Sequence, residues 1–62
     1  MYIEELLWLI NDSTVVEIYD SNQELIGLYD GKDSIPDEIV ESDRRVEDIF
    51  VDGNKLCIEI SD

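Results

Sequence analysis

The sequence predicts an α+β domain: a four-stranded antiparallel sheet of two hairpins, with an N-terminal helix on one face and a short helix between the hairpins. Three observations predict it. A helical stripe opens the chain, two apolar runs flank a short polar loop, and two more flank a Gly-Asn turn near the C-terminus. At 62 residues the chain has room for one small domain, which we place at 1–62.

Residues 2–11 show the i, i+3, i+4, i+7 apolar spacing of one helical face, which predicts the N-terminal helix. The stripe consists of Ile3, Leu6, Leu7 and Ile10. Three other apolar residues, Tyr2, Trp8 and Leu9, lie off the stripe. Because a helix that is apolar on several sides tends to be covered on several sides, these residues favour a contact with another chain.

The first hairpin is predicted from strands at 14–19 and 25–29, joined by the polar loop 21–23. The expected pairs are Asp20–Glu24, Ile18–Ile26 and Val16–Leu28. The last four of these residues would face the helix and enter the core. The opposite face would hold Val15, Glu17, Tyr19, Leu25, Gly27 and Tyr29.

A polar linker, 30–34, follows the first hairpin, and a brief helix is expected at 36–41. Pro36 suits the first turn of a helix, and two acids follow it there. Ile39 and Val40 would hold this helix against the sheet.

The second hairpin is predicted at 46–60, because Gly53 and Asn54 tolerate the positive φ that tight hairpin turns need. The expected pairs are Asp52–Lys55, Val51–Leu56, Ile49–Ile58 and Glu47–Ile60. Ile49, Val51, Leu56, Ile58 and Ile60 would face the helix, and Asp48, Phe50, Cys57 and Glu59 would face outward. Asp48 would then lie opposite Glu59, a like-charge pair that costs stability unless a bulge near Glu47 relieves it.

The charge of the chain excludes several classes of ligand. Acidic residues number 17 and basic residues 4, giving a formal charge of −13. Such a surface repels phosphate and nucleic acid.

Disorder of the acidic chain is disfavoured, because its hydrophobic residues, 44% of the total, fall in periodic runs. A sheet face with alternating acids resembles a row of phosphates, so one interpretation is a decoy for a nucleic-acid-binding protein. The other is a solvated acidic face.

The sequence contains no pattern that indicates catalysis or a cofactor. Without histidine, a Ser-His or Cys-His pair is impossible within one chain. The single cysteine, Cys57, excludes an internal disulfide and sits among acids that raise a thiol pKa. Acids at 30, 33, 37 and 38 lack the spacing of a calcium loop, so we expect them to be solvated rather than metal-binding. We therefore predict that the protein is not an enzyme.

Three segments carry a resemblance to a known group of proteins: VVEIYDSNQELIGLYDG, IPDEIV and VEDIFVDGNKLCIEI. They resemble short acidic proteins encoded in phages and prophages of Gram-positive bacteria. The resemblance implies a small early phage protein. Proteins of that type often bind and block a host machine, including antiviral defence nucleases and helicases.

These observations lead to the hypothesis of a phage-type inhibitor that binds a basic surface on a host defence protein. The expected partner-binding residues are Glu17, Asp48, Glu59, Trp8, Tyr19, Tyr29 and Phe50. The alternative is a dimeric accessory module of a phage regulatory or assembly complex. A homodimer is expected in either case, since one core of this size supplies only about 3–5 kcal/mol.

The expected location is the cytoplasm of the host cell. The first residues show no basic leader, no apolar run approaches a membrane span, and the single cysteine suits a reducing compartment. We therefore expect neither a membrane nor a nucleic acid as a direct partner.

Overall fold

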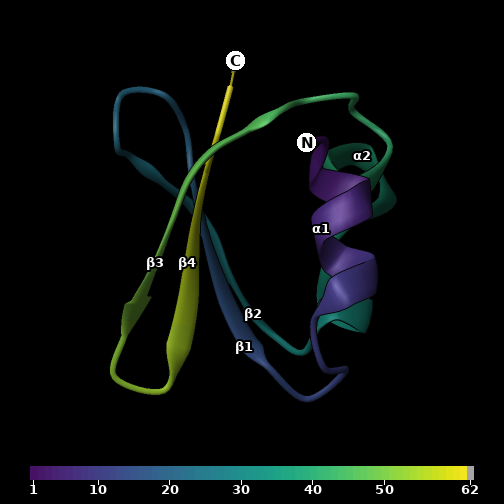
Figure 1. Ribbon diagram of the computed structural model, residues 1–62, viewed down its shortest axis with the longest axis vertical. Helices are drawn as coiled ribbons and strands as arrows, with labels where there is room; N and C mark the ends of the chain where they lie inside the picture. Colours follow the sequence, from purple (N-terminus) through teal and green to yellow (C-terminus); the bar gives the residue numbers. More distant parts are fainter. Residues whose placement is uncertain (62) are drawn as a thin grey trace.

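The computed structural model describes residues 1–61, which form a four-stranded sheet on one side and a layer of helices on the other (Figure 1). The elements are α1 (Ile3–Leu9), β1 (Val15–Tyr19), β2 (Leu25–Asp30), the 3₁₀ turn η1 (Lys32–Ser34), α2 (Asp37–Val40), β3 (Val46–Asp52) and β4 (Lys55–Ile60). The predicted α+β class and the order of helices and strands are confirmed.

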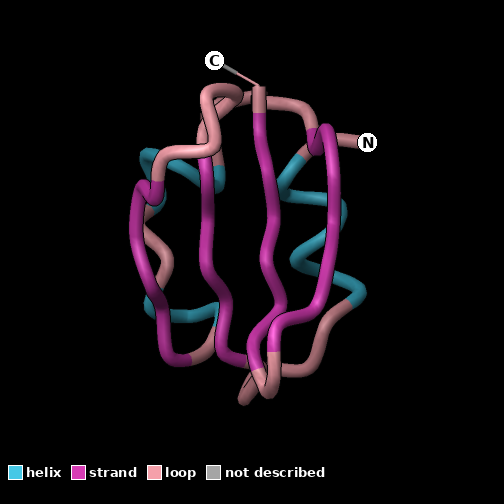
Figure 2. The backbone as a smooth tube through the Cα atoms, turned by 90° about the vertical axis from the view of Figure 1, so that its left-hand side faces the viewer, coloured by secondary structure: helices cyan, strands magenta, loops and turns pink. Residues whose placement is uncertain are grey.

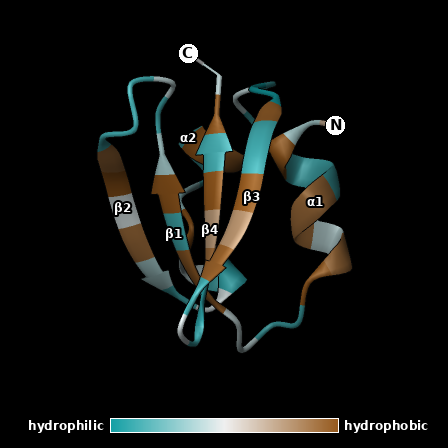
Figure 3. Ribbon diagram, turned by 60° about the vertical axis from the view of Figure 1, so that its left-hand side comes forward, coloured by the Kyte–Doolittle hydropathy of each residue, from teal (hydrophilic) through white to brown (hydrophobic). Residues whose placement is uncertain are grey.

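The sheet is mixed rather than purely antiparallel, which corrects the predicted arrangement. Its strand order is β2-β1-β4-β3, and the two central strands β1 and β4 are parallel (Figure 3). Residues 31–45 connect one edge strand to the other through the helix layer. A connection of this length can bring the chain back in the same direction, so β3 runs parallel to β2 and β4 runs parallel to β1.

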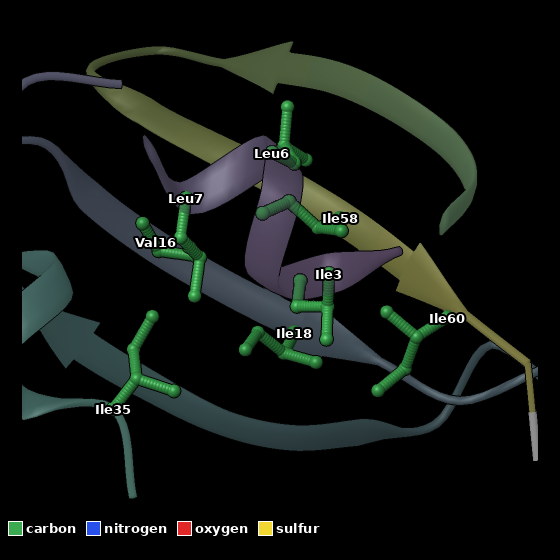
Figure 4. Packing of buried hydrophobic residues seen from close by; sticks show 8 residues of the cluster. All are labelled: Ile3, Leu6, Leu7, Val16, Ile18, Ile35, Ile58 and Ile60. Atoms are coloured by element: carbon green, nitrogen blue, oxygen red, sulfur yellow. The ribbon is translucent and has the colours of Figure 1, made fainter. Parts of the chain in front are cut away.

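The core lies between α1 and the two central strands (Figure 4). The buried cluster consists of Ile3, Leu6, Leu7, Val16, Ile18, Ile35, Ile58 and Ile60. The predicted helical stripe is therefore confirmed, although the helix ends at Leu9 because Ile10 is already extended (φ −102°, ψ 157°). Ile35, between η1 and α2, is a core residue that the periodicity does not indicate.

The first hairpin has the predicted loop but a different register beyond it. The Asp20 N–H donates to the Glu24 carbonyl oxygen at 3.0 Å, as that loop requires. Ile26 is then bulged, so that the pairs become Ile18–Gly27 and Val16–Tyr29. The predicted pairs Ile18–Ile26 and Val16–Leu28 are wrong by one residue. Because a shift of one residue exchanges the two faces of a strand, Tyr29 faces the helices and Leu28 faces outward.

Gly27 explains why this register is accommodated. A Cβ at position 27 would overlap the ring of Tyr29, so the ring lies over the bare backbone of the glycine. Tyr29 packs against the core from there, while Leu28 is 55% exposed.

The second hairpin follows the prediction over most of its length. Gly53 has a φ of +64°, and the predicted pairs Asp52–Lys55, Val51–Leu56 and Ile49–Ile58 are all present. Asp48 lies opposite Glu59, as expected from the same register. Glu47 is bulged, so that Ile60 pairs with Val46 and not with Glu47. The bulge leaves Asp48 opposite Glu59 and does not relieve that contact.

Several residues predicted to be buried are exposed on the two edge strands. On β3, Ile49 and Val51 point to the helix side but are 43% and 71% exposed, because β3 lies at the margin of the sheet. On β2, Ile26 and Leu28 are exposed because of the bulge. The core is therefore centred on β1 and β4.

The predicted short helix is confirmed in position. It spans Asp37–Val40, with Pro36 at its N-cap and acids in its first turn. Ile39 and Val40 are half-buried and pack against the core, as expected. The preceding linker is more ordered than predicted, because η1 forms within it.

Lys32 in η1 caps the C-terminus of α1. Its Nζ donates to the carbonyl oxygens of Leu7 at 3.0 Å and Ile10 at 3.1 Å, and lies 3.2 Å from a carboxylate oxygen of Asp12. The last carbonyls of a helix have no partner within it, and a cation there also interacts favourably with the helix dipole. Lys32 thus ties the helix layer to the end of β2.

Replacing Lys32 with methionine should lower the free energy of unfolding by about 1–3 kcal/mol, because two carbonyls lose a charged donor. Asp12→Asn should cost less than about 1 kcal/mol, since its carboxylate is largely exposed and the carbonyl bonds remain. Urea unfolding followed by circular dichroism measures both. Equal losses in the two variants would show that the ion pair, and not the cap, carries the effect.

Candidate protein-binding face of the sheet

The face of the sheet opposite the helices, which looks toward the viewer in Figure 2, is here called the outer face. It gathers charged and aromatic side chains from three strands. Pairing between neighbouring strands places Glu17 beside Cys57, Tyr19 beside Glu59, Asp48 opposite Glu59 and Phe50 opposite Cys57. Leu28 of β2 lies beside Glu17 on the same face. The outer face is thus assembled across the parallel pair at the centre of the sheet.

The structure brings most of the predicted partner-binding residues together on this face. They are Glu17, Tyr19, Asp48, Phe50 and Glu59. The other two lie elsewhere. Tyr29 faces the helices and packs against the core, so its predicted place on the outer face is wrong. Trp8 is 76% exposed on α1, in the opposite layer of the molecule.

Glu17 is buried in the middle of the outer face and has two partners from the chain itself. The Tyr19 hydroxyl donates to one carboxylate oxygen at 2.6 Å, and the Lys55 Nζ lies 3.2 Å from the other. The hydrogen bond from Tyr19, followed by that from Lys55, lowers the pKa of Glu17 below its ordinary value. The same bond raises the pKa of Tyr19 to about 12. The charge of Glu17 is therefore compensated internally.

Lys55 is a member of this network that sequence reasoning missed. Its contact with Glu17 depends on β4 lying beside β1 in parallel. The sequence does not determine which strand of the first hairpin lies beside which strand of the second. No local pattern around Lys55 indicates its contact with Glu17.

The lowered pKa of Glu17 predicts a pH-dependent difference between the wild type and Glu17→Gln. Ionised Glu17 stabilises the fold at pH values above its ordinary pKa of 4.5, and this stabilisation is lost as pH falls through the lower folded pKa. The wild type should be the more stable at neutral pH, and the two proteins should converge in acid. Thermal unfolding across a pH series measures the gap.

Glu24→Gln is the matched control, because it removes one negative charge from an exposed position. The pH-dependent gap should be larger for Glu17→Gln than for this control. A gap that persists in acid, or that is equal for both variants, would contradict the role given to Glu17.

Asp48 and Glu59 differ from Glu17 because no basic group of residues 1–61 pairs with them. One oxygen of Asp48 accepts the N–H of Ile49 at 2.9 Å. The two residues face each other across β3 and β4, an arrangement that is unfavourable for like charges. A cation placed beside both would remove this cost.

Two aromatic rings lie next to these carboxylates. The centroids of Tyr19 and Phe50 are 6.1 Å apart, with the ring planes tilted by 32°. Together with Asp48, Glu59 and Gln23 they line a hollow of about 220 Å³. Gln23, from the loop between β1 and β2, is a second residue that sequence reasoning did not single out.

The outer face also has an apolar margin. Leu25 and Leu28 of β2 are each 55% exposed, and hydrophobic residues run along β2 while hydrophilic bands lie side by side on β3 and β4 (Figure 3). Aromatic and aliphatic residues next to acids match the usual composition of a protein interface, in which apolar anchors are surrounded by polar groups.

Cys57 lies under this face and has the properties of a packing residue. It is buried opposite Phe50. Burial, followed by the nearby charges of Glu17 and Asp52, raises the pKa of its thiol. A thiol with a raised pKa is a poor nucleophile, as the surrounding acids in the sequence predict.

Among residues 1–61, no group of three or more cysteine, aspartate or glutamate side chains is arranged to hold a metal ion. None of the helices in this part of the chain is long and apolar enough to cross a membrane. Comparisons with protein-family models, curated proteins and solved structures found no match.

Proposed function

We propose that the protein binds a basic surface of another protein through its outer face and acts without catalysis. The observation that carries this proposal is the pair of uncompensated carboxylates, Asp48 and Glu59, beside the aromatic rings of Tyr19 and Phe50. Carboxylates supply attraction and orientation toward lysine and arginine, and exposed rings supply apolar anchors.

The partner that we propose is a host antiviral defence nuclease or helicase, met in the host cytoplasm. Such proteins have basic grooves for nucleic acid, and a chain of charge −13 is attracted to them over distances of about a Debye length, roughly 8 Å at physiological salt. Asp48 and Glu59 face each other across neighbouring strands of the outer face, so their carboxylates can occupy positions that phosphates of a nucleic acid otherwise fill. The protein would then inhibit by occupying the groove.

Capture from a lysate of a Gram-positive bacterium tests this proposal. The full chain is immobilised, exposed to lysate at low salt, and eluted by raising the salt; a second column carries Asp48→Asn/Glu59→Gln. Recovery of a nuclease or helicase by the wild type, and its loss with the variant, would support inhibition. Equal recovery on both columns would count against the outer face as the binding surface.

A dimeric accessory module of a phage regulatory or assembly complex is the second candidate. It is favoured by the exposure of Trp8 and Leu9, 76% and 73%, in the helix layer. Large exposed apolar residues often mark contacts between chains. Sedimentation of the pure protein distinguishes the candidates when combined with the capture: a dimer that recovers a phage structural protein favours the module.

A further inference from the structure

We propose that the hollow on the outer face receives the guanidinium group of one arginine side chain of the partner protein. This inference rests on the proposed function and deepens it by naming the group that is recognised. The hollow is lined by Tyr19, Gln23, Asp48, Phe50 and Glu59, which come from three strands and one loop.

The walls of the hollow match the two surfaces of a guanidinium group. The rings of Tyr19 and Phe50 offer aromatic faces on which a planar cation stacks. The carboxylates of Asp48 and Glu59 offer acceptors to its edge, and neither is paired with a basic group of residues 1–61. An arginine bound there would separate two like charges that now face each other across the hairpin.

The size and chemistry of the hollow disfavour other occupants. At about 220 Å³ it is smaller than the roughly 300–1,000 Å³ of small-molecule sites, so it suits a single side chain. A lysine ammonium is compact and strongly hydrated and has no flat face to place against the rings. Within residues 1–61 no group of acids is arranged as a metal site.

Three of the four basic residues of the chain are engaged elsewhere, and the fourth, Arg44, is not among the residues that line the hollow. Lys55 pairs with Glu17, and Lys32 caps α1 beside Asp12. Arg45 lies over the ring of Tyr2, with its Cζ 5.5 Å from the ring centroid. This last contact is a cation–π contact between a guanidinium group and a tyrosine ring, the kind of contact that we propose for the partner's arginine. The hollow is thus left to a cation from outside.

Titration of the full chain with Nα-acetyl-arginine amide, followed by NMR of the ¹⁵N-labelled protein, tests the inference. Saturable shifts should centre on the residues that line the hollow. Nα-acetyl-lysine amide should bind about fivefold more weakly, which is the scale of an exposed cation–π contact. Equal affinities for the two amides, or shifts spread evenly over the acidic surface, would overturn the proposal.

Two variants of equal charge locate the site. Asp48→Asn/Glu59→Gln should weaken arginine amide binding by tenfold or more, on the order of one lost charged hydrogen-bond pair. Asp33→Asn/Glu38→Gln removes the same charge from exposed positions in the helix layer and should leave binding within about twofold, since exposed charges at a distance are screened. Equal weakening by both double variants would mean that net charge alone accounts for the effect, and it would contradict the proposed site.

The experiments distinguish failure of the arginine proposal from failure of the proposed function. If arginine amide binds in the hollow but Asp48→Asn/Glu59→Gln captures the same protein as the wild type, the hollow is a guanidinium site and the proposed function fails. If the wild type captures a nuclease or helicase through the outer face but shows no preference for arginine amide, the arginine proposal fails alone.

Discussion

Replacing Ile18 with alanine is expected to unfold much of the protein, because the loss equals most of the stability of the domain. Truncating a buried isoleucine to alanine costs about 2–5 kcal/mol, through lost burial and the cavity left behind. A single core in a chain of this size supplies only about 3–5 kcal/mol. Ile18 is 0% exposed, so every side-chain atom that the substitution removes is taken from the core.

The position of Ile18 places the expected loss at the upper end of that range. It lies on a central strand, beside Ile58 of the parallel partner, and belongs to the cluster that packs under α1 (Figure 4). Neighbours on both sides of the strand are held by the sheet, so they cannot move in to fill the cavity.

Urea unfolding followed by circular dichroism measures this effect. Val51→Ala is the control, since Val51 is 71% exposed on an edge strand and its truncation should change stability by no more than about 0.5 kcal/mol. If Ile18→Ala were as stable as Val51→Ala, the core described here would be wrong.

Neutralising the uncompensated carboxylates is expected to slow association with the basic partner by tenfold or more at low salt. Electrostatic steering raises association rates by about 10–10³-fold, and charges at the binding face contribute most of it. Asp48→Asn/Glu59→Gln removes two such charges and also the repulsion between them. The variant should therefore be folded, and at least as stable as the wild type.

Stopped-flow association with the captured partner, over a series of salt concentrations, measures this effect. The rates of the wild type and the variant should converge at high salt, where charges are screened. Asp33→Asn/Glu38→Gln should retain most of the wild-type rate, because its charges lie in the helix layer. Association that does not respond to salt would contradict the electrostatic account.

The local elements of the fold could be predicted because local spacing determines them. The stripe from Ile3 to Leu7 defines one helical face, and the Gly53-Asn54 turn determines the register of the second hairpin next to it. The bulge at Ile26 could not be predicted from the loop, which keeps Asp20 opposite Glu24 in either register. The observed register is favoured because it lets the ring of Tyr29 pack over Gly27 and against the core.

The candidate site was predictable in its residues but not in its arrangement. Alternation along each strand places Asp48, Phe50 and Glu59 on the outward side of one hairpin. That Tyr19 joins them depends on β1 pairing with β4, a contact between segments far apart in the sequence. The ion pair between Glu17 and Lys55 depends on the same pairing, so the sequence alone predicts Glu17 as a partner-binding residue and does not indicate its internal partner.

Carbodiimide labelling of carboxylates in the complex with the captured partner, read by mass spectrometry, tests the central claim most directly. The claim is that the outer face is the binding surface. Labelling of Asp48 and Glu59 should fall sharply on binding, while Asp33 and Glu38 in the helix layer remain labelled as in the free protein. Unchanged labelling of Asp48 and Glu59, with protection of the acids in the helix layer instead, would contradict the account.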